Sequence, residues 1–347
     1  MLRTKNLNVI YFVGSEKEIS GGEKVIYRHS MLLNTCFKNI TSEIIPLKRS
    51  KISKYKNSLY KILNKKKKYT GWDISDVKIK AKHKTNFKSK HIKFKNNLFF
   101  DRNIDFVIIP EIFAHLANDI LIKNKIPYAI FVQNGFALNF TNNYQSLDNA
   151  YKNAKIILSV SEDTTKTISN VYENYSKKIF NINLSVGSNE FKPRLQKKNI
   201  ISYMPRKLPE HSQKLLFMLK NKLPSNWKVQ ALDKISNEKK LFNLLGKSKI
   251  FLSFSHMEGL GLPPLEAAKE GNKVIGYTGE GGKEYWKKPI FTEIPYGNLN
   301  MYINEIMKCI KSNCNYLKFK KQRIKLYKKY SPQEEIKSLG NLLNKIF

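Results

Sequence analysis

Two carboxylates, Glu258 and Glu266, flank the short segment Gly259-Leu260-Gly261-Leu262. Carboxylate oxygens accept hydrogen bonds from hydroxyl groups, and glycines let the backbone come close to a ligand. A helix that starts after such glycines presents backbone N–H groups and the positive end of its dipole, which together bind anions. The segment therefore predicts a site for a ligand that carries both phosphates and sugar hydroxyls.

Neighbouring elements must position these groups. The apolar stretch Ile250–Phe254 predicts a buried strand, and Glu258 opens the loop after it. The pair Pro263–Pro264 suits the first turn of a helix that runs to about Gly271, because proline fixes φ near its helical value. Taken alone, Glu266 is equally typical of a helix start, where a carboxylate gains about 0.3–1 kcal/mol from the dipole.

Strands and helices alternate along the rest of the chain, which predicts βαβ units, an α/β fold and parallel sheets. In the first half we expect a helix over Glu23–Phe37 after a loop at Ser20-Gly21-Gly22, and the strands Asn8–Val13, Glu43–Leu47, Phe106–Ile109, Tyr128–Val132 and Ile156–Val160. In the second half we expect the helices Pro209–Leu219 and Ser236–Lys247, and the strands Ile200–Met204, Trp227–Leu232 and Val274–Tyr277.

A length of 347 residues suits about two domains. We expect an N-terminal Rossmann-like domain over residues 1–190, a linker over 191–199 and a C-terminal Rossmann-like domain over 200–330. Ser331 and Pro332 predict the start of a C-terminal helix, 331–347, which carries one apolar stripe and completes the first domain.

The formal net charge is +36 at pH 7, and lysine supplies most of it, since only seven of the 63 basic residues are arginine. Two interpretations stay open: a lysine-rich genome, or an anionic partner such as nucleic acid, an acidic membrane surface or an acidic substrate. Nucleic acid is not expected, because arginine is the usual base-reading residue. A membrane surface fits better, since each lysine near anionic lipid adds about 1 kcal/mol.

Much of this charge lies in the segment Lys48–Lys95, which holds eighteen basic residues against two acidic ones. The segment is either a solvated insertion or a surface that faces a membrane or a polyanion, with its aromatic side chains at the interface.

Cys36, Cys309 and Cys314 do not have the spacing of metal ligands, so a reduced, cytoplasmic location is the default expectation. No apolar run approaches the roughly 20 residues of a membrane span, so any membrane association would be peripheral, at the inner face.

The segment Glu258–Glu266 is followed by Ala267-Ala268 and by the glycine-bounded run 271–276. Two glutamates with seven residues between them, followed by a small-residue helix and a strand, resemble the family 4 (group 1) retaining glycosyltransferases. Weaker matches are Gly21-Gly22, Val160-Ser161-Glu162, Val186-Gly187 and Phe191-Lys192-Pro193. The resemblance implies the GT-B fold, in which two Rossmann-like α/β/α domains turn their parallel sheets toward each other across an interdomain cleft.

This resemblance also implies roles for the matched residues. Glu266 would bind the ribose hydroxyls of a nucleotide-sugar donor, and Glu258 would hold the hydroxyls of the transferred sugar. Backbone N–H groups of Gly259, Leu260, Gly261 and Leu262 would face the donor phosphates. Arg206 and Lys207 would neutralise the diphosphate and, with Glu258, form the catalytic set, although two such charges are also ordinary in this chain. The family often has lysine at position 211, where this chain has histidine, so Lys207 or Lys214 would take that role.

In the first domain, Gly21 and Gly22 would approach the same phosphates or the acceptor, although the pair alone is also typical of a plain turn. His115, Gln133 and Asn134 are candidates for acceptor contacts, against the simpler reading of a structural histidine. No Asp-x-Asp motif stands out, so we expect no metal ion and no cofactor, with basic side chains in their place.

The resemblance thus implies an enzyme that moves a sugar from a nucleoside-diphosphate sugar to a glycan or lipid-linked acceptor, with retention, in the synthesis of a surface polysaccharide or glycoconjugate. Two alternatives stay open. One is a different GT-B enzyme, such as a nucleotide-sugar epimerase or a phosphorylase, and the other is a non-catalytic polyanion-binding protein.

Overall fold

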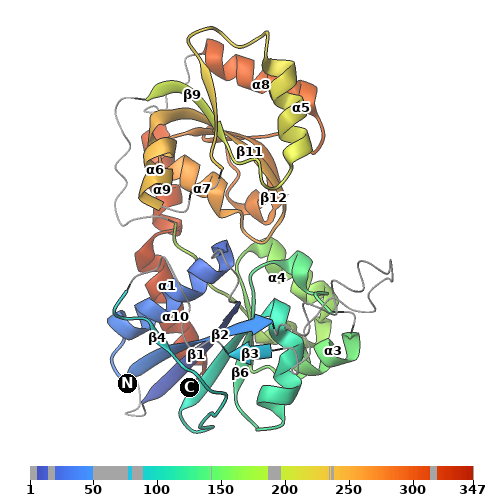
Figure 1. Ribbon diagram of the computed structural model, residues 1–347, viewed down its shortest axis with the longest axis vertical. Coiled ribbons are helices and arrows are strands. Elements are labelled where there is room, and N and C mark those ends of the chain that lie inside the picture. Colours follow the sequence, from blue (N-terminus) through green and yellow to red (C-terminus); the bar gives the residue numbers. More distant parts are fainter. Residues whose placement is uncertain are drawn as a thin grey trace. The chain divides into compact units, whose positions relative to one another are not determined.

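The computed structural model describes residues 6–14, 20–49, 77–79, 89–141, 143–186, 197–233, 235, 238–312 and 319–346. The predictions for most of Lys48–Lys95, for Gly187, for Phe191–Pro193 and for the cap Ser236 lie outside these residues. The chain forms two compact units (Figure 1): the first comprises Met1–Val160, Thr164–Ile182 and Ile336–Phe347, and the second comprises Ser161–Asp163 and Asn183–Glu335.

A mainly parallel sheet forms the centre of the first unit, in the order β3-β2-β1-β5-β6-β7-β8, with β4 also paired to β2. Among its described pairings, only that of β2 with β3 is antiparallel. The strands are β1 (Leu7–Gly14), β2 (Ile40–Arg49), β3 (Val77–Ile79), β4 (Lys93–Phe94), β5 (Asp105–Pro110), β6 (Tyr128–Val132), β7 (Ile156–Ser159) and β8 (Ile179–Asn181). The helical elements between and after them are α1 (Gly21–Cys36), η2 (Glu111–Leu116), η3 (Asn118–Ile122), η4 (Gly135–Ala137), α3 (Tyr144–Asn153), α4 (Glu162–Val171), η5 (Glu173–Lys178) and α10 (Pro332–Ile346).

The second unit has a parallel sheet of five strands in the order β10-β9-β11-β12-β13. These strands are β9 (Lys198–Tyr203), β10 (Lys228–Ala231), β11 (Ser248–Glu258), β12 (Lys273–Glu280) and β13 (Phe291–Glu293). Figure 1 shows helices on both faces of this sheet, α5 and α8 on one and α6, α7 and α9 on the other. Their bounds are α5 (Pro209–Leu219), α6 (Glu238–Lys247), α7 (Leu262–Lys269), η6 (Gly281–Glu284), α8 (Leu299–Lys311) and α9 (Lys320–Lys329).

Each sheet has one point where the chain reverses its direction of travel across the strands. In the first unit the chain goes from β1 to β2 on one side and later continues with β5 on the other. In the second unit it goes from β9 to β10 and then continues with β11 on the opposite side of β9. Ligands of open α/β sheets bind at such switch points, outside the carboxyl ends of the strands.

Burial follows the pattern of parallel sheets covered by helices. Every residue of β5 and β6 is buried, and a separate apolar cluster fills each unit. Strands covered on both faces read as continuous apolar runs, which is why the sequence locates them well.

The predicted bounds agree with the structure for α5 and β6, and the C-terminal helix begins at Pro332 beside its cap Ser331, whose Oγ accepts a bond from the Glu334 N–H at 3.2 Å. Two local predictions are wrong. Gly21 and Gly22 are not a loop but the first turn of α1, and β11 continues to Glu258, so this carboxylate ends a strand instead of opening a loop.

Cys309, on α8, is disulfide-bonded, whereas Cys36 is free. Cys309 therefore differs from the expectation of reduced cysteines. Among the described residues, no helix combines the length and the apolar character that crossing a bilayer requires.

Candidate functional site

An ion pair marks the switch point of the second unit. The Lys207 Nζ lies 2.9 Å from Oε1 of Glu258, and the two side chains are 36% and 22% exposed. Lys207 follows β9 and Glu258 ends β11, the two strands between which the chain reverses. The topology therefore brings a cation and a carboxylate, 51 positions apart in the sequence, to the place where a ligand is expected.

A β-bulge directs Glu258. The pairing of β11 with β12 is regular up to Ser255 and Thr278, but the next pair is Glu258 with Glu280, so β11 has one residue more than β12 over this stretch. Met257 takes up the difference with φ of 49°, a left-handed value that is uncommon for a residue with a side chain. Bulges of this kind re-aim side chains at the edges of sheets and next to active sites.

The loop after Glu258 is fixed by hydrogen bonds to its carbonyl groups. The Ser161 Oγ donates to the Gly259 carbonyl at 2.6 Å, and the Tyr285 hydroxyl donates to the Gly261 carbonyl at 2.7 Å. Gly261 has φ of 76° and is the N-cap of α7, where no side chain caps the helix. The start of α7 therefore has the positive dipole end and no side-chain cap, and since Pro263 and Pro264 carry no N–H, Gly261 and Leu262 supply the backbone N–H groups there.

Gly281 keeps a second backbone segment against this loop. A Cβ at position 281 would lie 1.9 Å from the Gly259 carbonyl oxygen and 2.7 Å from that of Glu258. Only glycine allows this approach, because the obstructing atoms belong to the backbone and cannot rotate away.

Glu266 is half-buried and is the fifth residue of α7, one position beyond its first turn. Lys269, on the same helix, is buried and donates to the Val186 carbonyl at 2.6 Å. Burial lowers the pKa of Lys269 to about 8, although the charges of Glu270 and Glu266 act in the opposite direction.

Arg206 is exposed in the turn between β9 and α5, one residue before Lys207. The His211 Nδ1 lies 3.1 Å from the Tyr277 hydroxyl, and the described part of the chain pairs Glu258 with Lys207. His211 is thus engaged with Tyr277, and Lys207 is the cation that contacts Glu258.

The first-unit candidates surround the start of α1. Ser20 caps this helix: its Oγ accepts from the Glu23 N–H at 3.2 Å, and the Glu23 Oε2 accepts from the Ser20 N–H at 2.6 Å. Gln133 donates from Nε2 to the Gly22 carbonyl at 3.0 Å, so the structure brings Gln133 and Gly22 together. An anion at this helix terminus would meet the Glu23 carboxylate, which opposes it electrostatically.

The remaining candidates of the first unit have structural partners. The Asn134 Oδ1 accepts from the Phe136 N–H at 3.0 Å, which caps η4. His115 is buried in η2, and its carbonyl accepts from Asn118 and Ser146.

Sequence reasoning missed Glu111, which follows β5 and is only 4% exposed. Its two carboxylate oxygens accept from the N–H groups of Gln133 at 3.2 Å and Asn134 at 3.0 Å. Burial raises the pKa of Glu111 to about 7, and these backbone bonds partly offset that rise. An acidic residue directly after a buried strand was the signal that could have identified it.

Glu284 is a second missed residue, in η6 beside the loop of Glu258. Its carboxylate accepts from the Glu162 N–H at 2.8 Å, from the Lys329 Nζ at 3.0 Å and from the Tyr330 hydroxyl at 2.6 Å. Burial, followed by the charge of Glu284, raises the pKa of Tyr330 well above its usual value. Glu284 therefore joins three segments of the second unit.

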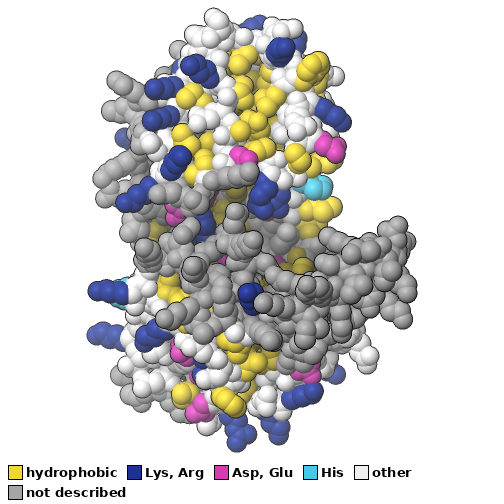
Figure 2. Space-filling view, viewed as in Figure 1, with side chains coloured by type: hydrophobic (Ala, Val, Ile, Leu, Met, Phe, Trp, Pro, Cys, Tyr) yellow, Lys and Arg dark blue, Asp and Glu magenta, His cyan; other side chains and the backbone are white. Residues whose placement is uncertain are grey.

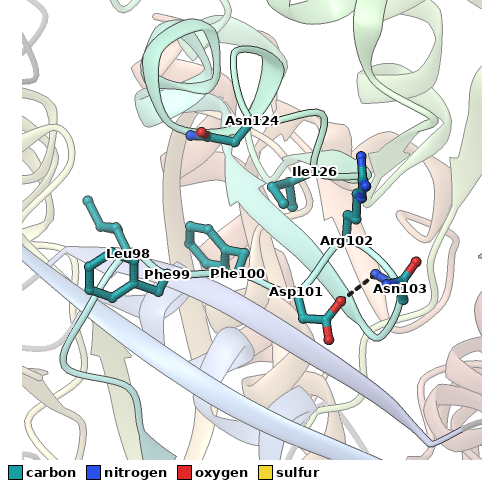
Figure 3. A pocket seen from close by; sticks show the side chains of 8 residues that line it. All are labelled: Leu98, Phe99, Phe100, Asp101, Arg102, Asn103, Asn124 and Ile126. Atoms are coloured by element: carbon teal, nitrogen blue, oxygen red, sulfur yellow. Dashed lines mark hydrogen bonds between the residues drawn. The ribbon is translucent and has the colours of Figure 1, made fainter.

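A hollow of about 640 Å³ lies elsewhere, in the first unit (Figure 3). Its lining is Leu98–Asn103, Asn124 and Ile126, which precede β5 and β6. The hollow is thus at the amino ends of these strands, the edge opposite to the switch point, and it includes none of the predicted site residues. Within the described residues, no group of three or more His, Cys, Asp or Glu side chains is arranged to bind a metal.

Comparisons with known proteins give no match to any protein-family model and none to a curated protein. Solved structures do match over nearly the whole chain. The lipopolysaccharide outer core galactosyltransferase WaaB has a TM-score of 0.66 at 14% identity, covering 98% of this chain and 100% of its own. Anabaena HepE, in complex with UDP, has a TM-score of 0.66 at 10% identity, covering 97% and 100%.

A mutant of S. aureus TarM, in complex with fondaparinux, α-GlcNAc-glycerol and UDP, has a TM-score of 0.65 at 14% identity and covers 97% of this chain and 100% of its own. At such low identity these likenesses establish architecture. The predicted fold class is confirmed: this chain has the two-domain α/β fold of the GT-B glycosyltransferases.

Proposed function

We propose that the protein is a glycosyltransferase that moves a sugar from a nucleoside-diphosphate sugar to a glycan or lipid-linked acceptor. The observation that carries the proposal is the Lys207–Glu258 ion pair beside the uncapped start of α7, at the switch point of the second sheet. A cation and helix N–H groups suit a diphosphate, and a carboxylate suits hydroxyl groups. Together they match the two halves of a sugar nucleotide.

Each of these groups has its own role in the transfer. Lys207, Arg206 and the α7 terminus stabilise the negative charge that develops on the leaving diphosphate. Glu258 accepts hydrogen bonds from the transferred sugar, and Glu266 accepts them from the ribose. We further propose that transfer retains the anomeric configuration and needs no metal ion, with the leaving phosphate helping to deprotonate the acceptor.

A ligand screen tests the central proposal. Purified protein is mixed with UDP-, GDP-, ADP- and CDP-sugars and its melting temperature is measured, beginning with UDP-sugars because HepE and TarM were solved with UDP. A ligand at 100 times its Kd stabilises the fold by about 2.7 kcal/mol. We expect stabilisation by one class in the native chain and a weaker effect in Glu258→Gln and Glu266→Gln; no stabilisation by any class contradicts the proposal.

Product analysis separates the neighbouring reactions. Mass spectrometry distinguishes a transferred sugar from an isomerised or a phosphorylated one, and the anomeric NMR coupling of the product reports retention. Turnover in the presence of EDTA checks independence of metal ions.

The charge of the chain is a separate matter. Figure 2 shows Lys and Arg side chains spread over the visible face of each unit among the described residues. An anionic membrane remains a proposed partner through Lys48–Lys95, and deleting this segment is expected to weaken binding to anionic liposomes while donor binding persists.

A further inference from the structure

Four aromatic rings gather on the α5 side of the second sheet. His211, Tyr277, Tyr296 and His256 come from α5, β12, the loop after β13, and β11, and we call them the aromatic shelf. The ring centre of Tyr296 lies 5.0 Å from that of His211, 5.2 Å from that of His256 and 5.3 Å from that of Tyr277. These separations are those of attractive ring contacts.

Tyr296 is fixed and exposed at the same time. Three rings hold its side chain, yet 59% of it is accessible to solvent, and Met257 beside His256 is 50% exposed. His211 is itself held by the contact of its Nδ1 with the Tyr277 hydroxyl. An ordered aromatic surface loses little conformational entropy when a ligand settles on it.

The shelf adjoins the two charged residues of the proposed donor site, Lys207 and Glu258. His256 and Met257 directly precede Glu258 on β11, and His211 follows Lys207 by four residues. The bulge at Met257 that directs Glu258 therefore also places His256 against Tyr296.

The chemistry of the shelf differs from that of the ion pair. Tyrosine and histidine combine an apolar ring with polar edge groups, and a hexose likewise combines an apolar C–H face with hydroxyl groups. Phosphate suits permanent cations and helix-terminal N–H groups, which the structure supplies at Lys207, Arg206 and the start of α7.

We propose that the aromatic shelf is a sugar-binding subsite on which Tyr296 stacks against the ring of a hexose unit of the acceptor. The inference rests on the proposed glycosyl transfer for the identity of the acceptor, while binding of a sugar to the shelf is measurable without it.

Saturation-transfer difference NMR with methyl α-D-glucopyranoside and methyl α-D-galactopyranoside tests the shelf on the full chain. We expect transfer from the native protein to at least one glycoside and a loss of about three- to tenfold in Tyr296→Ala, the worth of one ring contact. Tyr296→Phe keeps the ring and is expected to keep the signal. Tyr144→Ala is the matched control, since Tyr144 is also 59% exposed but lies on α3 of the first unit.

Several results would overturn the shelf: no signal from the native protein, an unchanged signal in Tyr296→Ala, or equal losses in Tyr144→Ala or Tyr296→Phe. The same experiment with uridine asks whether the ring stacks on a base instead, and a uridine signal that depends on Tyr296 while the glycoside signals do not counts against the proposal. If glycosides bind but no nucleotide sugar stabilises the protein, glycosyl transfer fails and the sugar subsite stands. If nucleotide sugars stabilise the protein but the glycoside signals do not depend on Tyr296, the sugar subsite fails and the proposed glycosyl transfer stands.

Discussion

The two switch points of the molecule have the same topology but carry different charged side chains: two carboxylates at the first, and a cation paired with a carboxylate at the second. In the first unit, the helix after β1 begins with a capping box that places the Glu23 carboxylate at its terminus, and the buried acid Glu111 follows β5. In the second unit, α7 has Gly261 as its N-cap and no side-chain cap, and the Lys207 ammonium contacts the Glu258 carboxylate. Each of the two sheets thus provides one place for a ligand, and the side chains at the helix starts decide which of the two places suits an anion.

The largest effect is expected from the glycines of the two sites. Gly281→Ala puts a methyl group into the Gly259 backbone, so we expect a loss of unfolding free energy of about 3 kcal/mol and of nucleotide-sugar stabilisation. Gly21→Ala is the matched change in the first unit, where a Cβ meets nothing within 4 Å, and we expect a change within about 1 kcal/mol. Urea unfolding measures both, and equal stability of the two variants would contradict the close approach at Gly281.

A buried acid gives the first unit its own pH dependence. The folded pKa of Glu111, about 7, exceeds the ordinary value of 4.5, so its contribution to stability is complete below pH 4.5 and is lost as the pH rises to 7. This linkage amounts to at most about 3 kcal/mol, and Glu111→Gln removes it. Unfolding free energies at pH 5 and pH 8 check this: the drop between them should be smaller in the variant than in the native chain, and equal drops argue against a raised pKa.

A buried base in the second unit acts in the opposite sense. The folded pKa of Lys269 is about 8 against an ordinary 10.5, so its contribution to stability is present above pH 10.5 and is lost as the pH falls through 8. Lys269→Met removes the titrating amine and also removes its hydrogen bond to the Val186 carbonyl. We expect the stability difference, variant minus native, to increase by up to about 3 kcal/mol as the pH falls from 10.5 to 8, as measured by denaturant titration. A constant difference would show that the amine titrates normally.

The smallest effect concerns ligand affinity. Glu258→Gln keeps the shape of the side chain and removes its charge, so we expect affinity for the stabilising nucleotide sugar to fall about 10- to 100-fold. The melting temperature should scarcely change, because a partly exposed ion pair contributes less than about 1 kcal/mol to stability. Glu23 is the carboxylate at the other helix start, where no donor is expected to bind. Calorimetric titration of Glu23→Gln should therefore give an affinity within about twofold of the native value. Similar losses in both variants would erase the distinction between the two switch points.

The sequence alone located the apolar parallel strands and several helix bounds, since burial on both faces and proline at a helix start leave strong local signals. Pro209 marks the start of α5, and Tyr128–Val132 is one apolar run from end to end. The capping box was also readable, as Ser20 followed three residues later by Glu23, but the glycines between them suggested a loop.

Other features depend on contacts between distant segments. The extra residue in β11 becomes visible only in its register with β12, so the bulge and the strand-end position of Glu258 could not be read from the sequence. The partners of Glu111 and Glu284 lie 22 or more positions away. The individual roles of Glu258 and Glu266 in binding a donor remain predictions that the experiments above address.

The left-handed backbone at Met257 has a consequence for how this protein can change over evolution. A non-glycine residue in this region is strained by about 1–3 kcal/mol, and glycine or asparagine would relieve that strain. Such a replacement raises the stability of the fold. It also loosens the bend that positions the Glu258 carboxylate on one side and the His256 imidazole on the other. Selection for heat resistance and selection for turnover should therefore favour different residues at this one position.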